Sequence, residues 1–328
     1  MTKKTTKKIV LLSSGGDAPG MNAAIRAVVR YAIHEGCSVY SSEAGFYGLV
    51  KQQITPLNAR SVANCIQRGG TILKTGRCQE FHSANVRDQV QEFLAAQHID
   101  GLIILGGNGS FAGAALLNKA GGPRVIGIPC TIDNDINGTE YCIGFDTACN
   151  TALEAIDKIR DTAFSLDRNF LIEVMGRASG FIAVNVGIAG GAEIILTPEF
   201  PMDIEQLANR IKQKSNKKLA SIIVVAEANQ PGHSFQLAKK IKEKTGVDYK
   251  VCVLGHTQRG GIPTNKDRVL GTLMGAKAIE ALMQGLTQKM VAMHNGKITV
   301  VDFPDSKHAT RYFSDQELLR ENEIICEL

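Results

Sequence analysis

Asp133 and Asp135 are the residues whose type and spacing most directly suggest chemistry. They follow an apolar run, residues 124–128, that has the composition of a buried strand. In extended backbone, side chains two residues apart point to the same side, so both carboxylates would face the space beyond the end of the strand. One carboxylate could then take a proton from an alcohol while the other acts electrostatically. Considered alone, the tripeptide at 133–135 also fits a solvated turn.

Two glycine-rich segments follow other apolar runs. Residues 14–20 have the sequence SGGDAPG, and residues 106–110 have the sequence GGNGS. Glycine turns of this kind let backbone amides approach phosphates at the N-terminus of the next helix. Neither segment matches the G-x-x-x-x-G-K-[ST] or the G-x-G-x-x-G pattern, so P-loop and dinucleotide-binding sites are disfavoured. The glycine pair at 15–16, taken alone, equally fits a structural turn.

The remaining strand ends supply two arginines, a histidine and a carboxylate. These groups are suited to gripping a sugar phosphate by its phosphate and its hydroxyls. The candidates are Met175, Gly176, Arg177, Glu227, His256 and Arg259. A single arginine at a strand end is more often part of a surface ion pair, and a single methionine is more often core. The interpretation therefore depends on the whole set.

Apolar β-branched runs alternate with stretches of helical period along the chain, which predicts βαβ units and a mostly parallel sheet. We expect strands at 8–12, 101–105, 124–128, 170–174, 220–226 and 250–254. We expect helices at 21–35, 85–97, 109–119, 145–160, 179–188, 203–214, 235–243 and 267–283. With 328 residues the chain fits one large α/β domain or two lobes.

Composition excludes several other classes of protein. Hydrophobic residues make up 44% and charged residues 21%, and no apolar run approaches the roughly 18 residues of a membrane span. The net charge of +5 comes without a block of basic residues, which disfavours a nucleic-acid partner. The eight cysteines form no C-x-x-C pair and indicate reduced thiols in the cytoplasm. The apolar run at 9–12 is too short for a signal peptide.

Five motifs then give the chain a family resemblance. In order they are SGGDAPGMNAAIR, GGNGS, TIDNDINGTEYCIGFDTA, EVMGRASG and VLGHTQRGG. With these motifs the chain resembles the bacterial ATP-dependent 6-phosphofructokinases over essentially its whole length. The resemblance implies two α/β lobes, each a mostly parallel sheet flanked by helices, with the active site in the cleft between them. The larger lobe, 1–143 and 257–306, would bind ATP, and the smaller lobe, 144–256 and 307–328, would bind fructose 6-phosphate.

The resemblance also assigns roles to single residues. Asp133 would be the base on the sugar hydroxyl, with Thr131 and Arg177 as further catalytic residues and Asp135 near Mg²⁺. The implied ATP site comprises Gly16, Arg77, Cys78, Gly107, Asn108, Gly109 and Ser110. The implied sugar-phosphate site comprises Thr131, Asp133, Arg168, Met175, Gly176, Arg177, Glu227, Lys250, His256 and Arg259.

Regulation and assembly are likewise implied by the resemblance. Arg168 would reach a neighbouring subunit of a homotetramer. The implied effector site, at which ADP or GDP activates and phosphoenolpyruvate inhibits, comprises Arg26, Arg30, Arg160, Glu193 and Lys218. Arg26 and Arg30, one helical turn apart, would equally fit a solvated helix face.

Gly109 and Cys130 favour ATP as the donor, because pyrophosphate-using relatives have an aspartate and a lysine at these two positions. The chain departs from the family pattern at Asn108, which replaces the aspartate that binds Mg²⁺, at Lys250, which replaces an arginine, and at Ala59, which replaces an effector-site arginine. An amide oxygen can bind Mg²⁺ but brings no charge.

Two alternatives follow. The first is a catalytically weak relative that binds nucleotide and sugar phosphate as a regulatory partner, which Asn108 would explain. The second is an NAD or lipid kinase with a related glycine turn, which leaves Glu227, His256 and Arg259 without a role.

Overall fold

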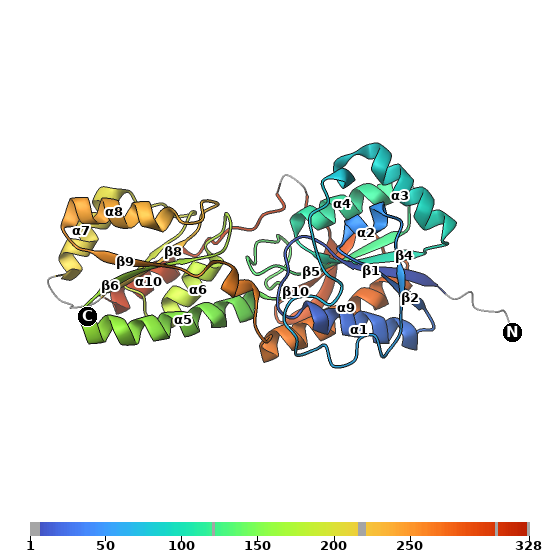
Figure 1. Cartoon of the computed structure of the whole chain (residues 1–328), viewed down its shortest axis with the longest axis horizontal. Helices are drawn as coiled ribbons and strands as arrows, with labels where there is room; N and C mark the ends of the chain where they lie inside the picture. The colour runs from blue at the N-terminus through green and yellow to red at the C-terminus, as the bar shows by residue number, and fades with distance from the viewer. Residues whose placement is uncertain (1–6, 120–121, 216–220, 306–307, 327–328) are drawn as a thin grey trace. The chain divides into compact units, whose positions relative to one another are not determined.

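The computed structural model describes residues 7–119, 122–215, 221–305 and 308–326 (Figure 1). The chain divides into two compact units, each with its own sheet. The larger unit comprises 1–132, 136–147 and 259–310, and the smaller comprises 133–135, 148–258 and 311–328. Among the described residues, no helix combines the length and the apolar character needed to cross a membrane.

The larger unit contains a seven-stranded sheet in the order β11-β10-β5-β4-β1-β2-β3. Its strands are β1 (Lys8–Ser13), β2 (Ser38–Ser42), β3 (Thr55–Leu57), β4 (Gly101–Gly106), β5 (Arg124–Pro129), β10 (Lys289–His294) and β11 (Lys297–Asp302). The strands from β10 to β2 pair in parallel, and the two edge strands β3 and β11 pair antiparallel. The carboxyl ends of the parallel strands therefore meet at one edge of the sheet.

Helices cover both faces of this sheet (Figure 1). One face carries α1 (Met21–His34) and α9 (Asn265–Met283), and the other carries α2 (Phe46–Val50), the 3-10 helix η1 (Glu80–His82), α3 (Ala84–Ala96) and α4 (Asn108–Lys119). Alternate residues of the central strands, such as Leu12 and Ile104, pack with Phe46, Leu94 and Leu117 in one core cluster. Because the central strands are buried on both faces, their sequences are continuously apolar.

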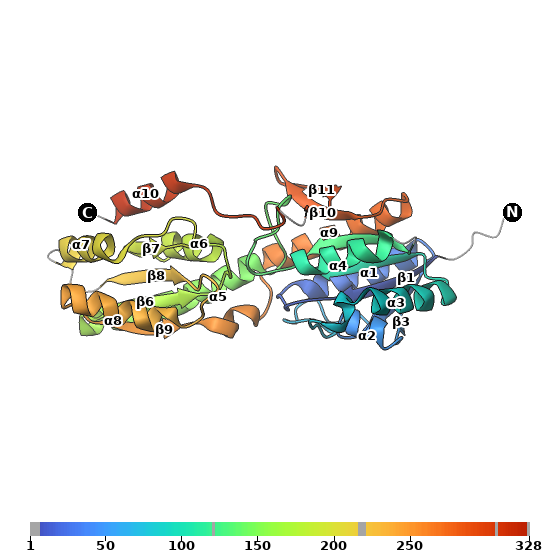
Figure 2. The same ribbon diagram turned by 90° about the horizontal axis from the view of Figure 1, so that it is seen from above.

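The smaller unit contains a four-stranded, fully parallel sheet in the order β7-β8-β6-β9. Its elements are α5 (Phe145–Leu166), β6 (Asn169–Val174), α6 (Phe181–Ala189), β7 (Ile194–Leu196), α7 (Ile204–Ser215), β8 (Ile222–Ala226), α8 (His233–Thr245), β9 (Tyr249–Val253), the 3-10 helix η2 (Gly255–Arg259) and α10 (Gln316–Ile325). Helices α7 and α8 close one core with Leu171, Ile223 and Val225 of the sheet. Figure 2 shows α10 on the side of this unit that carries α7 and β7.

The predicted fold class is confirmed, and every predicted strand and helix is present within a few residues of its expected bounds. The largest shift is in α5, which continues to Leu166. The sequence did not predict β2, β3, β7, β10, β11, α2 or α10. Several of them are short, as β3, β7 and α2 are, and the edge strand β11 is only partly buried, with the mixed sequence KITVVD.

The unit boundaries lie two to four residues from those of the expected lobes, and one short segment inside the larger lobe belongs to the smaller unit. Asp133–Asp135 makes its contacts within the smaller unit, although the flanking residues belong to the larger unit. The reason is local hydrogen bonding: the Ser179 hydroxyl donates to the Asp133 carbonyl, and the Arg311 amide donates to the Asp135 carbonyl. The assignment of a ligand to each unit stays a prediction.

Two glycines bring α1 and α9 into close contact. A Cβ added at Gly271 would lie 2.9 Å from the Gly20 carbonyl oxygen, and one added at Gly275 would lie 2.7 Å from the Ala24 carbonyl oxygen. The spacing of four residues puts both glycines on the same face of α9. This contact holds α1 against the unit, and α1 follows directly after the glycine turn at 15–16.

We predict that Gly275→Ala destabilises the protein by about 1–3 kcal/mol, although alanine has the higher helix propensity, because the added methyl overpacks the helix contact. Urea unfolding monitored by circular dichroism measures this change. The matched control is Leu273→Ala on the exposed side of the same helix, which should stay within about 0.5 kcal/mol of the parent. A stabilised Gly275→Ala protein would contradict the close contact.

Candidate active site

Backbone amides and glycines gather at the carboxyl ends of β1 and β4 in the larger unit. The Ser110 hydroxyl donates to the Ser14 carbonyl at 3.1 Å, which joins the two glycine turns. A Cβ added at Gly107 or Gly109 would meet no atom within 4 Å, so the space beside this turn is open. Helix α4 begins at Asn108, and its first amides lie at this edge of the sheet. An open helix N-terminus is a suitable site for a phosphate.

A distant loop brings Arg77 and Cys78 to the same edge. The Gly15 amide donates to the Gly76 carbonyl at 3.1 Å, and the Thr75 hydroxyl donates to the Gly15 carbonyl at 3.0 Å. Arg77 is exposed beside these contacts. Partial burial, and a hydrogen bond from its thiol to Glu80, raise the pKa of Cys78, so this side chain stays protonated at neutral pH.

Asn22 holds residues 68–72, which lead into that loop. Its side chain is fully buried, donates to the Arg68 carbonyl at 3.0 Å and accepts from the Ile72 amide at 2.8 Å. The sequence analysis did not assign Asn22 a role. Its position inside the SGGDAPGMNAAIR motif was the available signal, but its partners, more than 40 residues away in the chain, could not be read from the sequence.

Arg259 also belongs to the larger unit. Its guanidinium lies against Gly16, where any side chain would collide with Nη1, and Nη1 donates to the Asp17 carbonyl at 3.4 Å. The residue that we predicted to bind the sugar phosphate is therefore placed beside the glycine turn predicted to bind ATP. A side chain at position 16 would displace the Arg259 guanidinium from this place.

The turn at residues 132–135, named the catalytic turn after the predicted base Asp133, is buried. Asp133 is 2% exposed and Asp135 is 6% exposed, so the alternative of a solvated turn is wrong. The prediction of extended backbone is also wrong, because Asn134 has φ of 51° and lies in the left-handed region. Asparagine tolerates this conformation better than most residues. The turn, and not the pleat of a strand, therefore sets the directions of the two carboxylates.

Arg177 lies beside Asp135. Nη1 of Arg177 is 3.9 Å from Oδ2 of Asp135, and the Arg177 amide donates to Oε1 of the buried Glu227 at 3.0 Å. Burial raises the pKa of the Asp135 carboxyl, and the nearby guanidinium partly opposes this rise. Arg177 has φ of 53°, a conformation that costs energy for a residue with a side chain and is often found at functional sites.

Two further side chains hold the predicted Met175-Gly176-Arg177 segment. The Met175 amide donates to Oε1 of Gln258 at 2.8 Å, and Gln258 is fully buried. The Ser179 hydroxyl lies 3.1 Å from the Gly176 carbonyl and 3.0 Å from the Asp133 carbonyl. Neither Gln258 nor Ser179 was predicted, although both lie within motifs that we had identified. Both side chains hold backbone groups by hydrogen bonds, and such bonds cannot be recognised from composition or residue spacing.

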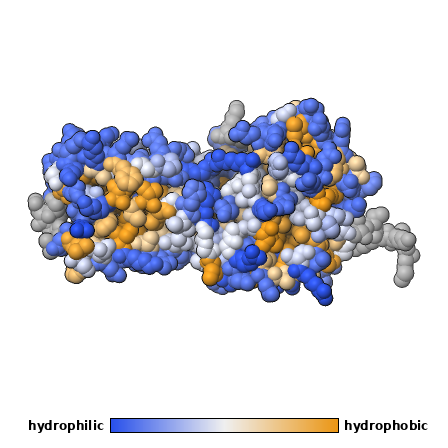
Figure 3. Space-filling view, viewed as in Figure 1, coloured by the Kyte–Doolittle hydropathy of each residue, from blue (hydrophilic) through white to orange (hydrophobic). Residues whose placement is uncertain are grey.

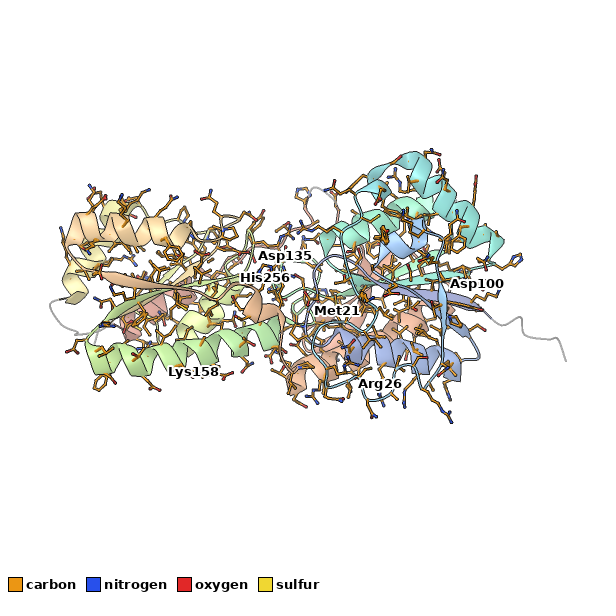
Figure 4. The ribbon with its side chains drawn as sticks, in the orientation of Figure 1. Met21, Arg26, Asp100, Asp135, Lys158 and His256 are labelled. Atoms are coloured by element: carbon orange, nitrogen blue, oxygen red, sulfur yellow. The ribbon has the colours of Figure 1, made fainter. Side chains whose placement is uncertain are left out.

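His256 lies on η2, directly after β9, and its side chain is exposed. Figure 4 shows His256 and Asp135 at the same end of the smaller unit, where β6 and β9 finish. Because these strands are parallel neighbours, their carboxyl ends carry Arg177 and His256 to one edge. Arg177, Glu227, His256 and the two aspartates are thus brought to one region of this unit.

Lys250 and Arg168, which were also predicted to bind the sugar phosphate, lie at other positions of the smaller unit. Lys250, on β9, is exposed and donates to Asp248 at 2.8 Å, and together with Lys242 it lowers the pKa of Asp248 to about 2. Arg168 is exposed in the turn between α5 and β6. No further structural role for these two residues is assigned.

The predicted effector residues fall into two groups. Arg160 and Glu193 pair at 3.9 Å in the smaller unit, where Arg160 also donates to the Gly191 carbonyl at 2.8 Å. Arg26 and Arg30 lie on α1 of the larger unit, and Figure 4 shows Arg26 on the outer side of that helix. Lys218 lies outside the described residues.

The donors available for Mg²⁺ fit a metal carried by the nucleotide. Within the described ranges, no group of three or more His, Cys, Asp or Glu side chains is arranged to hold a metal ion. Mg²⁺ is usually held by one or two protein oxygens together with substrate phosphates and water. Asn108 is the first residue of α4, and its side-chain Oδ1, the predicted ligand, is buried.

Comparison with known proteins shows the family. A sequence profile described as phosphofructokinase matches residues 8–282. The chain belongs to the phosphofructokinase family. It is 70% identical over 320 residues to the ATP-dependent 6-phosphofructokinase of Coxiella burnetii, covering 98% of both chains. It is 49% identical over 323 residues to ATP-dependent 6-phosphofructokinase 1 of Thermus thermophilus, covering 98% of this chain and 99% of the relative.

Solved phosphofructokinases have the same fold. The yeast enzyme from Saccharomyces cerevisiae superposes with a TM-score of 0.83 at 31% identity, over 90% of this chain and 44% of the yeast chain. A pyrophosphate-dependent phosphofructokinase from Nitrosospira multiformis superposes with a TM-score of 0.86 over 98% of this chain and 91% of its own. At 20% identity this second likeness supports the fold alone.

We predict that Arg177→Gln raises the pKa of Asp135 further, because it removes the opposing charge. A carboxyl whose pKa is raised by folding stabilises the protein below its unfolded pKa of about 3.9, and this contribution is lost as pH rises through the folded pKa. In Arg177→Gln the loss should extend to higher pH.

The measurement is urea unfolding from about pH 3.5 to about pH 7, with and without Asp135→Asn in each background. Asp135→Asn removes the titrating group and is the control. In each background, the difference between the curves with and without Asp135→Asn gives the contribution of Asp135. If this contribution were lost over the same pH range in the parent and in Arg177→Gln, Arg177 would not influence the pKa of Asp135.

Proposed function

We propose that this chain is an ATP-dependent 6-phosphofructokinase. It transfers the γ-phosphoryl group of MgATP to the 1-hydroxyl of fructose 6-phosphate and releases fructose 1,6-bisphosphate and ADP. The observation that carries the proposal is the buried catalytic turn, with Arg177 and Glu227 beside it, in a chain 70% identical to a relative of that name.

Asp133 is the general base in this proposal. Its carboxylate accepts the proton of the sugar 1-hydroxyl as the hydroxyl oxygen bonds to the γ-phosphorus and the bond from that phosphorus to the leaving ADP oxygen breaks. Burial keeps bulk water from competing for the base. Ser179 and Arg311 hold the backbone of the turn on either side, which fixes the direction of attack. Arg177 and Thr131 place positive charge and a hydroxyl near the transferring group.

The larger unit binds ATP in this proposal. The open amides at the N-terminus of α4, with Gly107, Gly109 and Ser110, hold the phosphates, and Arg77 supplies a cation from the neighbouring loop. The open space beside Gly109 accommodates the α-phosphate of a nucleotide, which favours ATP over pyrophosphate. Cys78 and Gly16 complete the nucleotide site.

The nucleotide phosphates would hold Mg²⁺, with the Asn108 side-chain amide as the proposed protein ligand and Asp135 as the proposed nearby carboxylate. When bound, the metal neutralises charge that develops on the transferring phosphoryl group.

The smaller unit binds fructose 6-phosphate. Glu227 accepts from sugar hydroxyls, and His256 and Arg177 carry the positive charge that a phosphate requires. The backbone at Met175 and Gly176 lines the sugar, and Arg259 is a further proposed ligand of the phosphate. Lys250 keeps the charge of the usual arginine without its bidentate geometry, so it holds the phosphate more weakly.

A homotetramer acting in the cytoplasm completes the proposal. Phe164 and Leu166 are 82% and 52% exposed just before Arg168, and exposed apolar side chains of this size are suited to a subunit contact. Figure 3 shows apolar patches among the hydrophilic surface of the smaller unit. Arg168 of a neighbouring subunit would then reach the sugar phosphate. Arg26, Arg30, Arg160, Glu193 and Lys218 form the proposed site for ADP, GDP or phosphoenolpyruvate.

We predict that Asp133→Ser lowers kcat by about 10²–10⁴-fold, because the base is lost, while ATP binding persists. A coupled assay for fructose 1,6-bisphosphate measures kcat, and calorimetry measures ATP binding. Asp203→Ala, which removes a carboxylate capping α7 in the same unit, is the control and should keep the parent rate. A near-normal rate for Asp133→Ser would exclude Asp133 as the base.

Asn108 is the one observation that favours a catalytically weak relative, and nothing in the comparisons favours that alternative. We predict that the parent and Asn108→Asp differ in kcat by less than about tenfold, because the phosphates supply most of the ligands to Mg²⁺. The same coupled assay measures both proteins. An inactive parent whose activity is restored by Asn108→Asp would instead support the weak relative.

A further inference from the structure

The segment that leads into α10 runs beside the catalytic turn. Thr310 forms an antiparallel bridge with Ile136, and the Asn137 amide donates to the Ala309 carbonyl at 2.9 Å. The Arg311 amide donates to the Asp135 carbonyl at 2.8 Å. Residues 309–311 thus hold the backbone just after Asp133 by three consecutive pairings. In Figure 2 this segment is the red coil that continues into α10.

Glu199 anchors that segment two residues further on. Its Oε1 accepts from the Phe313 amide at 3.0 Å. The same oxygen accepts from the Gly180 amide at 2.8 Å. Gly180 is the N-cap residue of α6, so this hydrogen bond ties the start of α6 to the loop that carries Glu199.

The Gly180 side of this contact also reaches the catalytic turn. Ser179, the preceding residue, donates its hydroxyl to the Asp133 carbonyl at 3.0 Å. One carboxylate oxygen of Glu199 therefore joins two supports of the turn: Ser179 at Asp133, and the Arg311 backbone at Asp135.

Aromatic packing fixes the same junction. The buried Phe313 ring meets Phe181 edge-on at 5.8 Å and Phe200 edge-on at 6.3 Å. The Arg311 guanidinium lies over the Phe181 ring at 4.6 Å. These contacts hold Phe313 and Phe181, the neighbours of the two amides that Glu199 accepts from, against each other.

We propose that Glu199 is a positioning residue for the reaction: it holds Ser179-Gly180 and the 311–313 segment together, and through them it sets the position of Asp133. This inference rests on the proposed role of Asp133 as the base. Hydrogen bonds to a carboxylate are about twice as strong as those between neutral groups, so replacing Glu199 loosens both supports. The loss should appear in the rate of phosphoryl transfer and not in the binding of either substrate.

The test compares Glu199→Ala, Glu199→Gln and Asp203→Ala with the parent. Asp203 is the matched control, because its carboxylate caps the N-terminus of α7 in the same unit by accepting from the Gln206 amide at 2.8 Å, with no link to the turn. Steady-state kinetics give kcat and KM for both substrates. Hydrogen exchange, measured without substrates, reports the local opening of 131–137 and 309–313.

We expect Glu199→Ala to lower kcat by about tenfold or more, with each KM within about threefold of the parent value. Exchange in 131–137 and 309–313 should be faster in Glu199→Ala than in Asp203→Ala. Glu199→Gln keeps an oxygen acceptor and should recover most of the rate and protection.

Equal protection of the two segments in Glu199→Ala and Asp203→Ala would overturn the proposal, as would a kcat equal to that of Asp203→Ala. If Glu199→Ala does not fold, Glu199→Gln is compared with Asp203→Ala instead. We then expect a smaller fall in kcat and in exchange protection. Parent values of both quantities in Glu199→Gln would overturn the proposal. A parent without kinase activity would instead refute the proposed function, and the exchange comparison would still decide whether Glu199 holds the turn.

Discussion

Burying Asp133 and Asp135 removes two carboxylates from water, and the surrounding groups have to compensate for the lost hydration. The Ser179 hydroxyl and the Arg311 amide hold the backbone of the turn from two sides by donating to the Asp133 and Asp135 carbonyls. The Arg177 guanidinium adds a counter-charge near Asp135, yet burial remains the larger influence on its pKa. These backbone contacts keep the two acidic side chains in place at the buried turn.

In the larger unit, glycines allow close contacts at the predicted site. Glycines stand where backbone or cation must approach closely: Gly16 beneath the Arg259 guanidinium, and Gly107 and Gly109 at the open start of α4. The parallel sheet supplies the framework, because it brings the carboxyl ends of β1, β4 and β5 to one edge. Phosphoryl transfer needs positioning and electrostatic stabilisation more than covalent participation, and an edge built of amides and glycines provides both.

Several residues support the site without touching a substrate in the proposed mechanism. Asn22 holds the loop that leads to Arg77, and Gln258 holds the Met175 backbone. Glu199 accepts from the Gly180 and Phe313 amides and so links the two segments that contact the catalytic turn. All three act on backbone amides or carbonyls far away in the chain. The precision of the site therefore depends on side chains of ordinary type whose partners are set by the fold.

The sequence by itself determined the α/β class, the family resemblance and most long elements, because buried parallel strands and amphipathic helices have strong periodic patterns. It also marked the strand ends where Asp133, Arg177 and His256 lie. Only the tertiary structure decided that Asn134 is left-handed, that the 133–135 segment is buried with the smaller unit, and that Arg259 lies on Gly16. The physical reason is that a local pattern reports which face of an element is buried, whereas backbone conformation in a turn and long-range hydrogen bonds depend on partners that only the folded chain brings together.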